Sequence, residues 1–327
     1  ELELALLGQV GVHLDARCAA LGIPRLGYEE AFRQVRDKLR DEVRLPVEQR
    51  HLTLAAGQYA TDPQVLVPAL HPYCTRRVTA MGRIDGRKVT DVGPGTAAAR
   101  RRLASLIATA LLVRPLFSSA GEVLVHGDPH AGNLLVTPGG QLGLLDWSLA
   151  GRLSEGQREA LVQVLVGALL RDERRVADML STLSEAPPPS TGRLLEVVRR
   201  RLWKTRSGRP PDFGWVVGLM DEAVQHGGLR AGSVLLLLRK SLHTIAGVVE
   251  ELAPGYPSID QAFFSDVIAR LTLEWPQRWL APPDSRAFAT RLSNADLTQL
   301  MLSLPFAATR LWLGRAWGET EDRGRRP

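Results

Sequence analysis

The chain has 327 residues, which is enough for one large domain or two domains of ordinary size. Its apolar and charged fractions, 45% and 23%, are typical of globular proteins and exclude disorder of the chain as a whole. The formal net charge of +6 indicates either a mildly basic surface or an anionic partner such as a nucleotide or a membrane surface. Net charge alone does not support a nucleic-acid partner, and we expect none.

The cysteines and the hydropathy of the sequence indicate the cellular compartment. Cys18 and Cys74 lie in no CxxC motif or Cys/His cluster, so the sequence indicates neither a zinc site nor a disulfide framework. This fits a reducing cytoplasm. No stretch has the pattern of a signal peptide, and no apolar run approaches the roughly 20 residues of a spanning helix. We expect a cytoplasmic protein, with peripheral attachment to the inner face of the plasma membrane as an alternative.

The first third of the chain is expected to be helical, except for one strand pair. Apolar spacing predicts a helix over residues 3–21 and a second from residue 28 to 40, continuing to 59 with Pro46 at a kink or a fresh start. The stretches "VLVPAL" and "RRVTAM" predict two strands with a turn near His71 and Pro72. A long apolar helix is expected over residues 96–117.

The centre of the chain predicts a hairpin, and the rest predicts helices. "NLLV" and "QLGLLD" are strand-like and flank a strong turn, Thr-Pro-Gly-Gly, at residues 137–140. Ser154 and Gln157 form a capping box that opens a helix to about residue 170. A proline-rich break lies at residues 187–189. Further helices are expected over residues 193–204, 213–225, 233–252, 258–273 and 297–315.

One constellation carries chemistry: His126, Asp128, Asn133 and Asp146. Asp128 precedes Asn133 on a turn-rich loop, and Asp146 follows the hairpin. Phosphoryl transfer needs one carboxylate to orient the nucleophile, and a second carboxylate with an amide to hold Mg²⁺ against phosphates. A D-x4-N loop, a hairpin and another Asp bring those groups to one small volume, as in the kinase layout.

The segment "VHGDPHAGNLLVTPGGQLGLLDWSLAGRLS" resembles the signature of the ABC1/ADCK/UbiB (AarF-type) atypical kinase family, H-x-D-P-H-P-G-N followed by L-x-L-[IL]-D-F-G-x-x-G-x-L. Aminoglycoside and choline phosphotransferases share H-G-D-x-H-x-x-N and I-D-W. The Asp-Pro-His step and "AGRLS" favour the ABC1 group. "LRDEVRLPVEQRHL", "VLVPALHPYCTRRVTAMGRIDG" and "LLLLRKSLHTIAGVVEELAPGYP" extend the resemblance over about residues 34–258.

The resemblance implies an α+β, predominantly α fold: a protein-kinase-like C-lobe with a partial N-lobe and extra C-terminal helices. We expect the partial N-lobe, with its helices and a strand pair leading to the hinge, at residues 1–84. The kinase-like C-lobe, with the catalytic and metal-binding loops, is expected at residues 85–255. A C-terminal helical extension is expected at residues 256–327.

The resemblance also implies site roles. Asp128 orients or deprotonates the attacking group, while His126 and His130 shape the catalytic loop. Mg²⁺ is expected at Asn133 and Asp146. The expected ATP site also includes Glu42 and Glu48 on the N-lobe helix and the hinge backbone around Met81 and Arg83.

The chain departs from the family pattern at several places, including the family's Asn after E-A, where this chain has "EQRH". Arg44 stands where the family's E-x-D motif has its second acid. Ser148 stands where the DFG-like triplet has glycine, a change that costs backbone freedom. The upstream K-x-G-Q motif and V-A-x-K strand have no counterpart, so we expect either that the chain begins within a longer protein, which the first residue Glu1 favours, or that the N-lobe has been lost.

The leading hypothesis is an atypical kinase or ATPase, dependent on ATP and magnesium, that supports ubiquinone or other isoprenoid-lipid metabolism. One alternative is a small-molecule phosphotransferase of the aminoglycoside/choline type. The other is a degenerate, non-catalytic scaffold. The phosphoryl acceptor and the oligomeric state stay open.

An anionic membrane surface and a quinone or isoprenoid lipid are candidate partners besides the nucleotide. Residues 193–209, which hold a cluster of arginines around Trp203, predict either a lipid-binding face or a solvated helix face. Residues 297–317 predict either an interfacial helix or one packed on the core.

Overall fold

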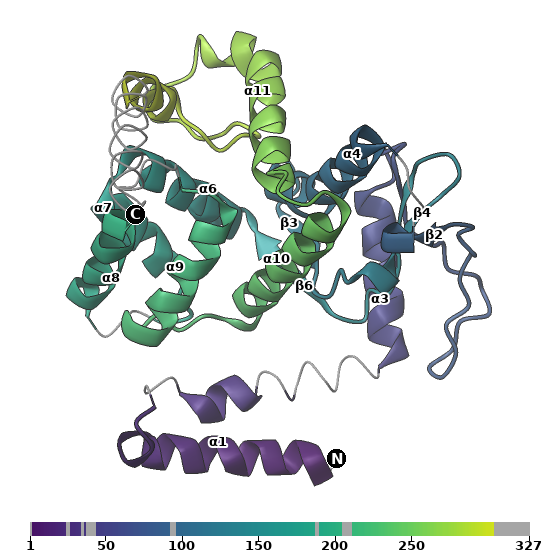
Figure 1. Cartoon of the computed structure of the whole chain (residues 1–327), viewed down its shortest axis with the longest axis horizontal. Coiled ribbons are helices and arrows are strands. Elements are labelled where there is room, and N and C mark those ends of the chain that lie inside the picture. Colours follow the sequence, from purple (N-terminus) through teal and green to yellow (C-terminus); the bar gives the residue numbers. More distant parts are fainter. Residues whose placement is uncertain are drawn as a thin grey trace, which may run out of the picture. The chain divides into compact units, whose positions relative to one another are not determined.

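The computed structural model describes residues 2–23, 27–33, 36, 44–91, 96–186, 190–204 and 211–303. The chain divides into two compact units, one of Glu1–Glu155 with Ala231–Ile268 and one of Gly156–Arg230 with Ala269–Pro327. Helices dominate both units, with a few short strands in the first (Figure 1). The predicted α+β, predominantly α fold is confirmed.

The first unit contains all the described strands, in two small sheets. The four-stranded sheet has the order β1-β5-β4-β2, in which β1 and β5 are parallel and the other pairs antiparallel. The two-stranded sheet pairs β3 with β6 antiparallel. The strands are β1 (Val65–Leu66), β2 (Arg87–Lys88), β3 (Glu122–His126), β4 (Leu134–Val136), β5 (Leu142–Leu144) and β6 (Ala150–Ser154).

Helices of the first unit cover these sheets. The long helix α10 packs against α4 and against β6 and β3 (Figure 1). The core joins buried residues of α3, α4 and α10 to the strand residues Leu134, Leu142 and Leu144. The labelled helices of this unit are α1 (Leu2–Leu21), α3 (Leu45–Gln58), α4 (Ala97–Ala108), α5 (Arg114–Leu116), α10 (Ser233–Leu252) and the start of α11 (Ser258–Arg278). Residues 28–33, within the predicted second helix, are helical as well.

The predicted apolar helix of residues 96–117 is present, but it widens in the middle. A π-helix, Thr109–Val113, joins α4 to α5, and the Arg114 N–H reaches back to the Thr109 carbonyl. In a π-helix the carbonyl of Ala110 would accept from the N–H of residue 115. That residue is Pro115, which has no N–H. The Tyr59 hydroxyl donates to that carbonyl instead, at 2.8 Å. Burial raises the pKa of Tyr59, so the hydroxyl keeps its proton.

Other predicted elements are confirmed or corrected by the local hydrogen bonds. The hairpin β4–β5 is confirmed, and α3 begins afresh with Pro46 in its first turn. The predicted pairing of "VLVPAL" with "RRVTAM" is wrong as a ladder: Leu70 and Met81 form one isolated bridge, and β1 pairs with β5 instead. Pro68 lacks the N–H that a continuous strand would need. The pairing of β3 with β6 was not predicted.

The second unit is helical in its described part. Helix α8 packs against α7 and α9. Asp172 and Asp212 cap α7 and α9 by accepting from the Arg175 and Trp215 N–H groups, at 3.0 and 2.7 Å. The helices are α6 (Glu155–Leu170), α7 (Glu173–Thr182), α8 (Thr191–Lys204), α9 (Phe213–His226), the later part of α11, and a helix that begins at Asn294.

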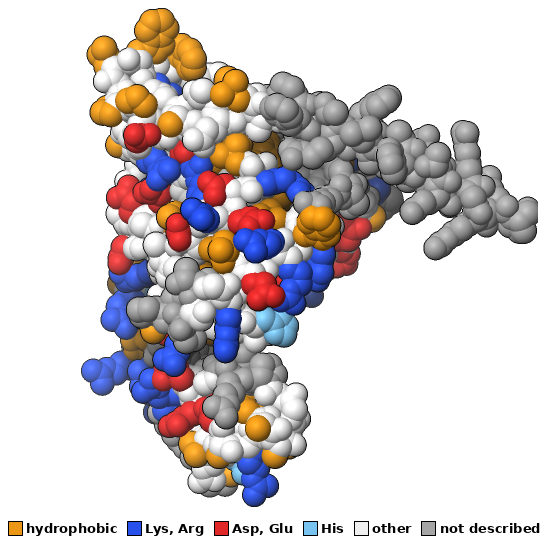
Figure 2. Space-filling view, turned by 90° about the vertical axis from the view of Figure 1, so that its left-hand side faces the viewer, with side chains coloured by type: hydrophobic (Ala, Val, Ile, Leu, Met, Phe, Trp, Pro, Cys, Tyr) orange, Lys and Arg blue, Asp and Glu red, His pale blue; other side chains and the backbone are white. Residues whose placement is uncertain are grey.

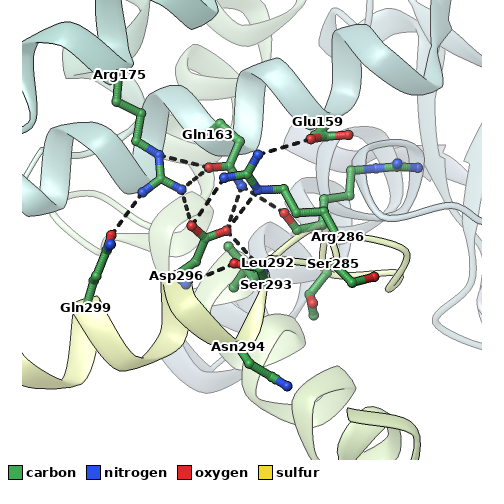
Figure 3. Close-up of polar contacts among 12 residues, drawn as sticks. Glu159, Gln163, Arg175, Ser285, Arg286, Leu292, Ser293, Asn294, Asp296 and Gln299 are labelled. Carbon is green, nitrogen blue, oxygen red and sulfur yellow. Dashed lines mark hydrogen bonds and ion pairs between the residues drawn. The ribbon is translucent and has the colours of Figure 1, made fainter. Parts of the chain in front are cut away.

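A buried polar network around Asp296 joins elements of the second unit (Figure 3). Ser293 and Asp296 form a reciprocal capping box, with bonds of 2.9 and 3.0 Å, at the start of the last described helix. Arg175 of α7 forms an ion pair with the Asp296 carboxylate. Arg286 and Gln163 donate to it at 3.0 and 3.1 Å. Burial alone would raise the pKa of Asp296, but the hydrogen bonds from Arg286, Ser293 and Arg175 hold that pKa well below its usual range.

The outer end of α11 exposes apolar side chains. Glu274 and Arg278 are buried, lie 2.6 Å apart and both bond to Thr290, so the two charges of residues 271–283 point inward. Hydrophobic side chains gather at the upper end of the view in Figure 2, where α11 ends. The exposed ones are Leu273 (77%), Trp275 (56%), Trp279 (75%) and Leu280 (95%). Within the described residues, the structure holds no helix that meets the length and hydropathy needed to cross a bilayer.

Replacing Asp296 with Asn should destabilise the protein by about 3 kcal/mol, because Arg175 and Arg286 would each lose a buried carboxylate partner. Arg286 would keep its pair with Glu159. Urea unfolding measures this difference. The native pKa of Asp296 lies below the unfolded value of about 4. The stabilisation is therefore complete above about pH 4 and is lost as the pH falls further, and D296N should lack this loss.

Asp178→Asn is the matched control, since this carboxylate is exposed on α7. It should leave the urea midpoint almost unchanged. A D296N protein as stable as the wild type at pH 7 would show that the network contributes little.

Candidate active site

Strand pairing brings the candidate catalytic loop to the end of β3. His126, the last residue of β3, lies opposite Ala150 of β6. The Gly127 N–H then donates to the Leu149 carbonyl at 2.8 Å. A Cβ atom on Gly127 would lie 2.8 Å from the same oxygen, so a larger residue does not fit. The glycine of "HGD" is thus required by the close approach of two chain segments.

Asn133 closes the loop that begins at Asp128. Its side-chain Nδ2 donates to the Asp128 carbonyl at 3.1 Å, across a short 3-10 helix, Ala131–Asn133. Its backbone carbonyl accepts from the Leu145 N–H at 2.9 Å. The D-x4-N spacing therefore holds both ends of the loop together and attaches them to the segment that leads to Asp146.

His126 connects the two candidate loops directly. Its ring is buried, its Nε2 lies 2.9 Å from the Leu145 carbonyl, and its Nδ1 lies 3.2 Å from the Asp128 backbone nitrogen. The neutral tautomer with its proton on Nε2 satisfies both contacts, because Nδ1 then accepts from the Asp128 N–H. Burial lowers the pKa of His126 and keeps the ring neutral.

Asp146 adopts a left-handed backbone conformation, with φ of 50°. Such conformations are costly outside glycine and often occur at functional sites. The Ser148 N–H and hydroxyl both donate to Asp146 Oδ1, at 3.1 and 2.6 Å, and stabilise the turn. Ser148 itself has no positive φ, so serine in place of the family's glycine carries no left-handed strain here.

Trp147 is a buried residue that packs beside the two loops. Its ring is fully buried and lies 4.7 Å from the His126 ring and 6.3 Å from the Tyr59 ring, centroid to centroid. Its carbonyl is 2.9 Å from Nδ1 of His51 on α3. Tryptophan at this position is therefore a core residue, and it does not by itself favour the aminoglycoside/choline alternative.

Glu48 extends from α3 toward the Asp146 loop. Burial and the negative charge of Asp146 raise the pKa of the Glu48 carboxyl, against the lowering effect of a hydrogen bond with Thr79. The two carboxylates are thus close enough to interact. Arg44 lies at the N-cap of α3, and Glu42 falls outside the described residues.

The remaining predicted residues, Met81, Arg83 and His130, make local contacts. Met81 packs against the hydrophobic core. Arg83 is exposed and pairs with Asp85 at 2.9 Å. His130 is exposed, and its Nδ1 accepts from the Gly132 N–H at 3.0 Å, which braces the loop locally.

Sequence reasoning missed Lys240, which lies on α10. Its Nζ is 3.0 Å from Oδ2 of Asp128. The only indication in the sequence was that this helix belongs to a segment similar to the family's. Asp128 is distant in sequence, and periodicity does not show which turn of a helix reaches a loop.

The oxygen atoms that the two loops offer as ligands suit Mg²⁺. Asn133 uses its Nδ2 on the Asp128 carbonyl, which leaves its Oδ1 to face a cation. Ser148 occupies Oδ1 of Asp146, which leaves Oδ2. Mg²⁺ takes oxygen ligands, and in nucleotide sites it is bound through one or two carboxylates together with phosphates. One amide oxygen and one carboxylate oxygen fit that pattern.

Replacing His126 with Ala should destabilise the protein by about 3 kcal/mol, because it opens a buried cavity and leaves the Leu145 carbonyl and the Asp128 N–H without their partner. Urea unfolding at pH 7 measures this loss. His71→Ala, at an exposed position, is the control and should change stability little. An H126A protein with unaltered stability would rule out a structural bridge.

The chain matches the family model described as the ABC1 atypical kinase-like domain over residues 13–180. This region contains His126, Asp128, Asn133 and Asp146, whereas Lys240 lies beyond it.

Curated relatives are similar at modest identity. The chain is 24% identical over 232 residues to "Protein ACTIVITY OF BC1 COMPLEX KINASE 1, chloroplastic" of Arabidopsis thaliana, covering 69% of this chain and 34% of that protein. It is 25% identical over 245 residues to "Probable protein kinase UbiB" of Histophilus somni (strain 129Pt), covering 72% of this chain and 44% of that protein. The matched region thus spans less than half of each relative.

Among solved structures, the one described as "The complex structure of Rv3197-erythromycin from Mycobacterium tuberculosis" has 18% identity and a TM-score of 0.43, and the match covers 72% of this chain and 58% of that chain. The family model itself covers more than half of the chain. The chain therefore belongs to the ABC1 atypical kinase-like family.

Proposed function

We propose that this chain carries the catalytic loops of an atypical kinase or ATPase of the ABC1/UbiB type, which uses ATP and Mg²⁺ in ubiquinone or other isoprenoid-lipid metabolism. The observation that carries this proposal is the network through His126 and Asn133, which ties the Asp128 loop to the segment preceding Asp146. The lipid pathway rests on the printed name UbiB of several relatives.

In this proposal each side chain has one task. Asn133 and Asp146 would hold Mg²⁺, which would neutralise charge on the nucleotide phosphates. Asp128 accepts the proton of a hydroxyl nucleophile, either an alcohol or water. The nucleophile's oxygen bonds to the γ-phosphorus, and the bond from that phosphorus to the bridging oxygen breaks, leaving its electron pair on ADP. His126 stays neutral and holds the loops in register.

The local geometry weakens one argument for a degenerate scaffold. Ser148 departs from the family triplet, yet its hydroxyl supports the Asp146 turn and its backbone is not strained. Arg44 keeps its reversed charge and stays an argument for the scaffold alternative. Binding of nucleotide decides between the two.

The test is Mg²⁺-dependent stabilisation by ATP, measured by thermal shift on this chain and on a version extended upstream in its gene. At about 100-fold excess over Kd, ATP should add roughly 2.7 kcal/mol. Asp146→Asn should abolish the response, because one of the two proposed metal ligands is lost. Asp178→Asn, which removes an exposed carboxylate, should leave it intact.

If neither protein responds to nucleotide, the catalytic proposal fails and the scaffold alternative replaces it. A response that persists in D146N would show that nucleotide binds without the proposed metal site. Phosphorylation of an aminoglycoside or choline, with no hydrolysis and no lipid-linked acceptor, would favour the small-molecule alternative.

We place membrane contact, the second part of this proposal, at the end of α11. Leu273, Trp275, Trp279 and Leu280 are exposed there, and tryptophan is suited to the bilayer interface. The basic face of α8 is a weaker candidate: Arg199 pairs with Glu173 at 2.9 Å, and Arg201 pairs with Glu222 at 2.8 Å. Those pairs favour the solvated-face interpretation. Residues 304–317 of the second predicted segment lie outside the described residues.

Vesicle flotation tests this placement, using phosphatidylcholine vesicles with and without phosphatidylglycerol. The wild type should float with both, since each buried Trp or Leu contributes about 2 kcal/mol. Joint replacement of Trp275, Trp279 and Leu280 by Ser should reduce the bound fraction at least fivefold. Arg199→Gln with Arg200→Gln is the control. Loss of binding in that control alone, with α11 variants unaffected, would assign the contact to α8.

A further inference from the structure

Lys240 reaches the candidate catalytic loop from a helix far along the chain. Its Nζ lies 3.0 Å from Oδ2 of Asp128. The helix that carries it, α10, packs on the strand pair that leads into this loop. A Cβ on Gly151 of β6 would lie 3.3 Å from Cγ1 of Val234 and 3.5 Å from Cδ1 of Leu237, so α10 and the strand approach closely. This close packing fixes the turn of α10 that faces Asp128.

The ion pair contributes little to stability. The Lys240 side chain is 48% exposed and that of Asp128 is 34% exposed. Pairs this accessible to water are strongly screened, and ordering a lysine side chain costs conformational entropy. Stability therefore does not account for a lysine held against the candidate catalytic base.

The chemistry of the loop leaves a place for a cation. Residues 126–133, "HGDPHAGN", contain no lysine or arginine. Phosphoryl transfer spreads negative charge over the oxygens of the transferred group, and cations stabilise that charge. A lysine ammonium has three donors, and the contact with Asp128 uses one of them. Because half of the side chain is exposed, the ammonium can still reach a second anion beside Asp128.

We propose that Lys240 is a phosphate-binding residue of this site, which contacts the terminal phosphate of a bound nucleoside triphosphate and holds it beside Asp128. The inference rests on the proposed function, and it adds a residue outside the region matched by the family model. The positive charge of Lys240 offsets the phosphate oxygens while Asp128 takes the proton of the nucleophile. A nucleoside diphosphate lacks the phosphate that Lys240 contacts.

The ratio of affinities for Mg·ATP and Mg·ADP tests this role, because a purely structural role would change both equally. Isothermal titration of Lys240→Gln should show Mg·ATP binding weakened at least tenfold, or about 1.4 kcal/mol, with Mg·ADP binding within twofold of the wild type. Lys240→Arg should recover part of the difference. Lys204→Gln, which removes an exposed lysine of α8, should match the wild type.

The outcomes separate this inference from the proposed function. If the wild type binds neither nucleotide, the proposed function fails and the inference fails with it. If the wild type binds both, and K240Q leaves the ratio unchanged, only the inference is overturned, whether or not turnover falls. The thermal midpoint of K240Q without nucleotide should match that of the wild type. An unchanged midpoint would show that any change in the ratio of Mg·ATP to Mg·ADP affinity does not arise from unfolding.

Discussion

The arrangement of the candidate site depends on one buried imidazole. His126 binds the Leu145 carbonyl through Nε2 and the Asp128 N–H through Nδ1, so a single neutral ring fixes the spacing of two loops. Its lowered pKa follows from burial, and a second proton would place a charge in the core and a donor against the Asp128 N–H. Trp147 packs against the same ring.

The carboxylates of Asp128 and Asp146 are held in place by different interactions. Asp128 is held through its backbone, which leaves its carboxylate to Lys240. Asp146 is held through its carboxylate, since Ser148 donates twice to Oδ1 while the backbone stays in a left-handed turn. The first arrangement suits a base that must exchange a proton. The second suits a ligand whose remaining oxygen has one fixed direction.

The second unit is stabilised by a different kind of interaction. There a single carboxylate, Asp296, receives hydrogen bonds from Arg175, Arg286, Gln163 and the backbone of Ser293 (Figure 3). Buried charges are costly unless they are fully bonded, and this one is. Burial of the Glu274–Arg278 pair beside the exposed tryptophans follows the same rule.

The sequence by itself determined the predominantly helical fold and the hairpin, and it singled out Asp128, Asn133 and Asp146 as one constellation. These depend on local periodicity, turn residues and short spacings, which a sequence displays directly. Only the tertiary structure decided that β1 pairs with β5, that β3 pairs with β6, that Ser148 supports Asp146, and that Lys240 faces Asp128. Those contacts depend on which helix turn and which strand register face each other across the core. That choice is made by packing between segments distant in the chain, and no local pattern records it.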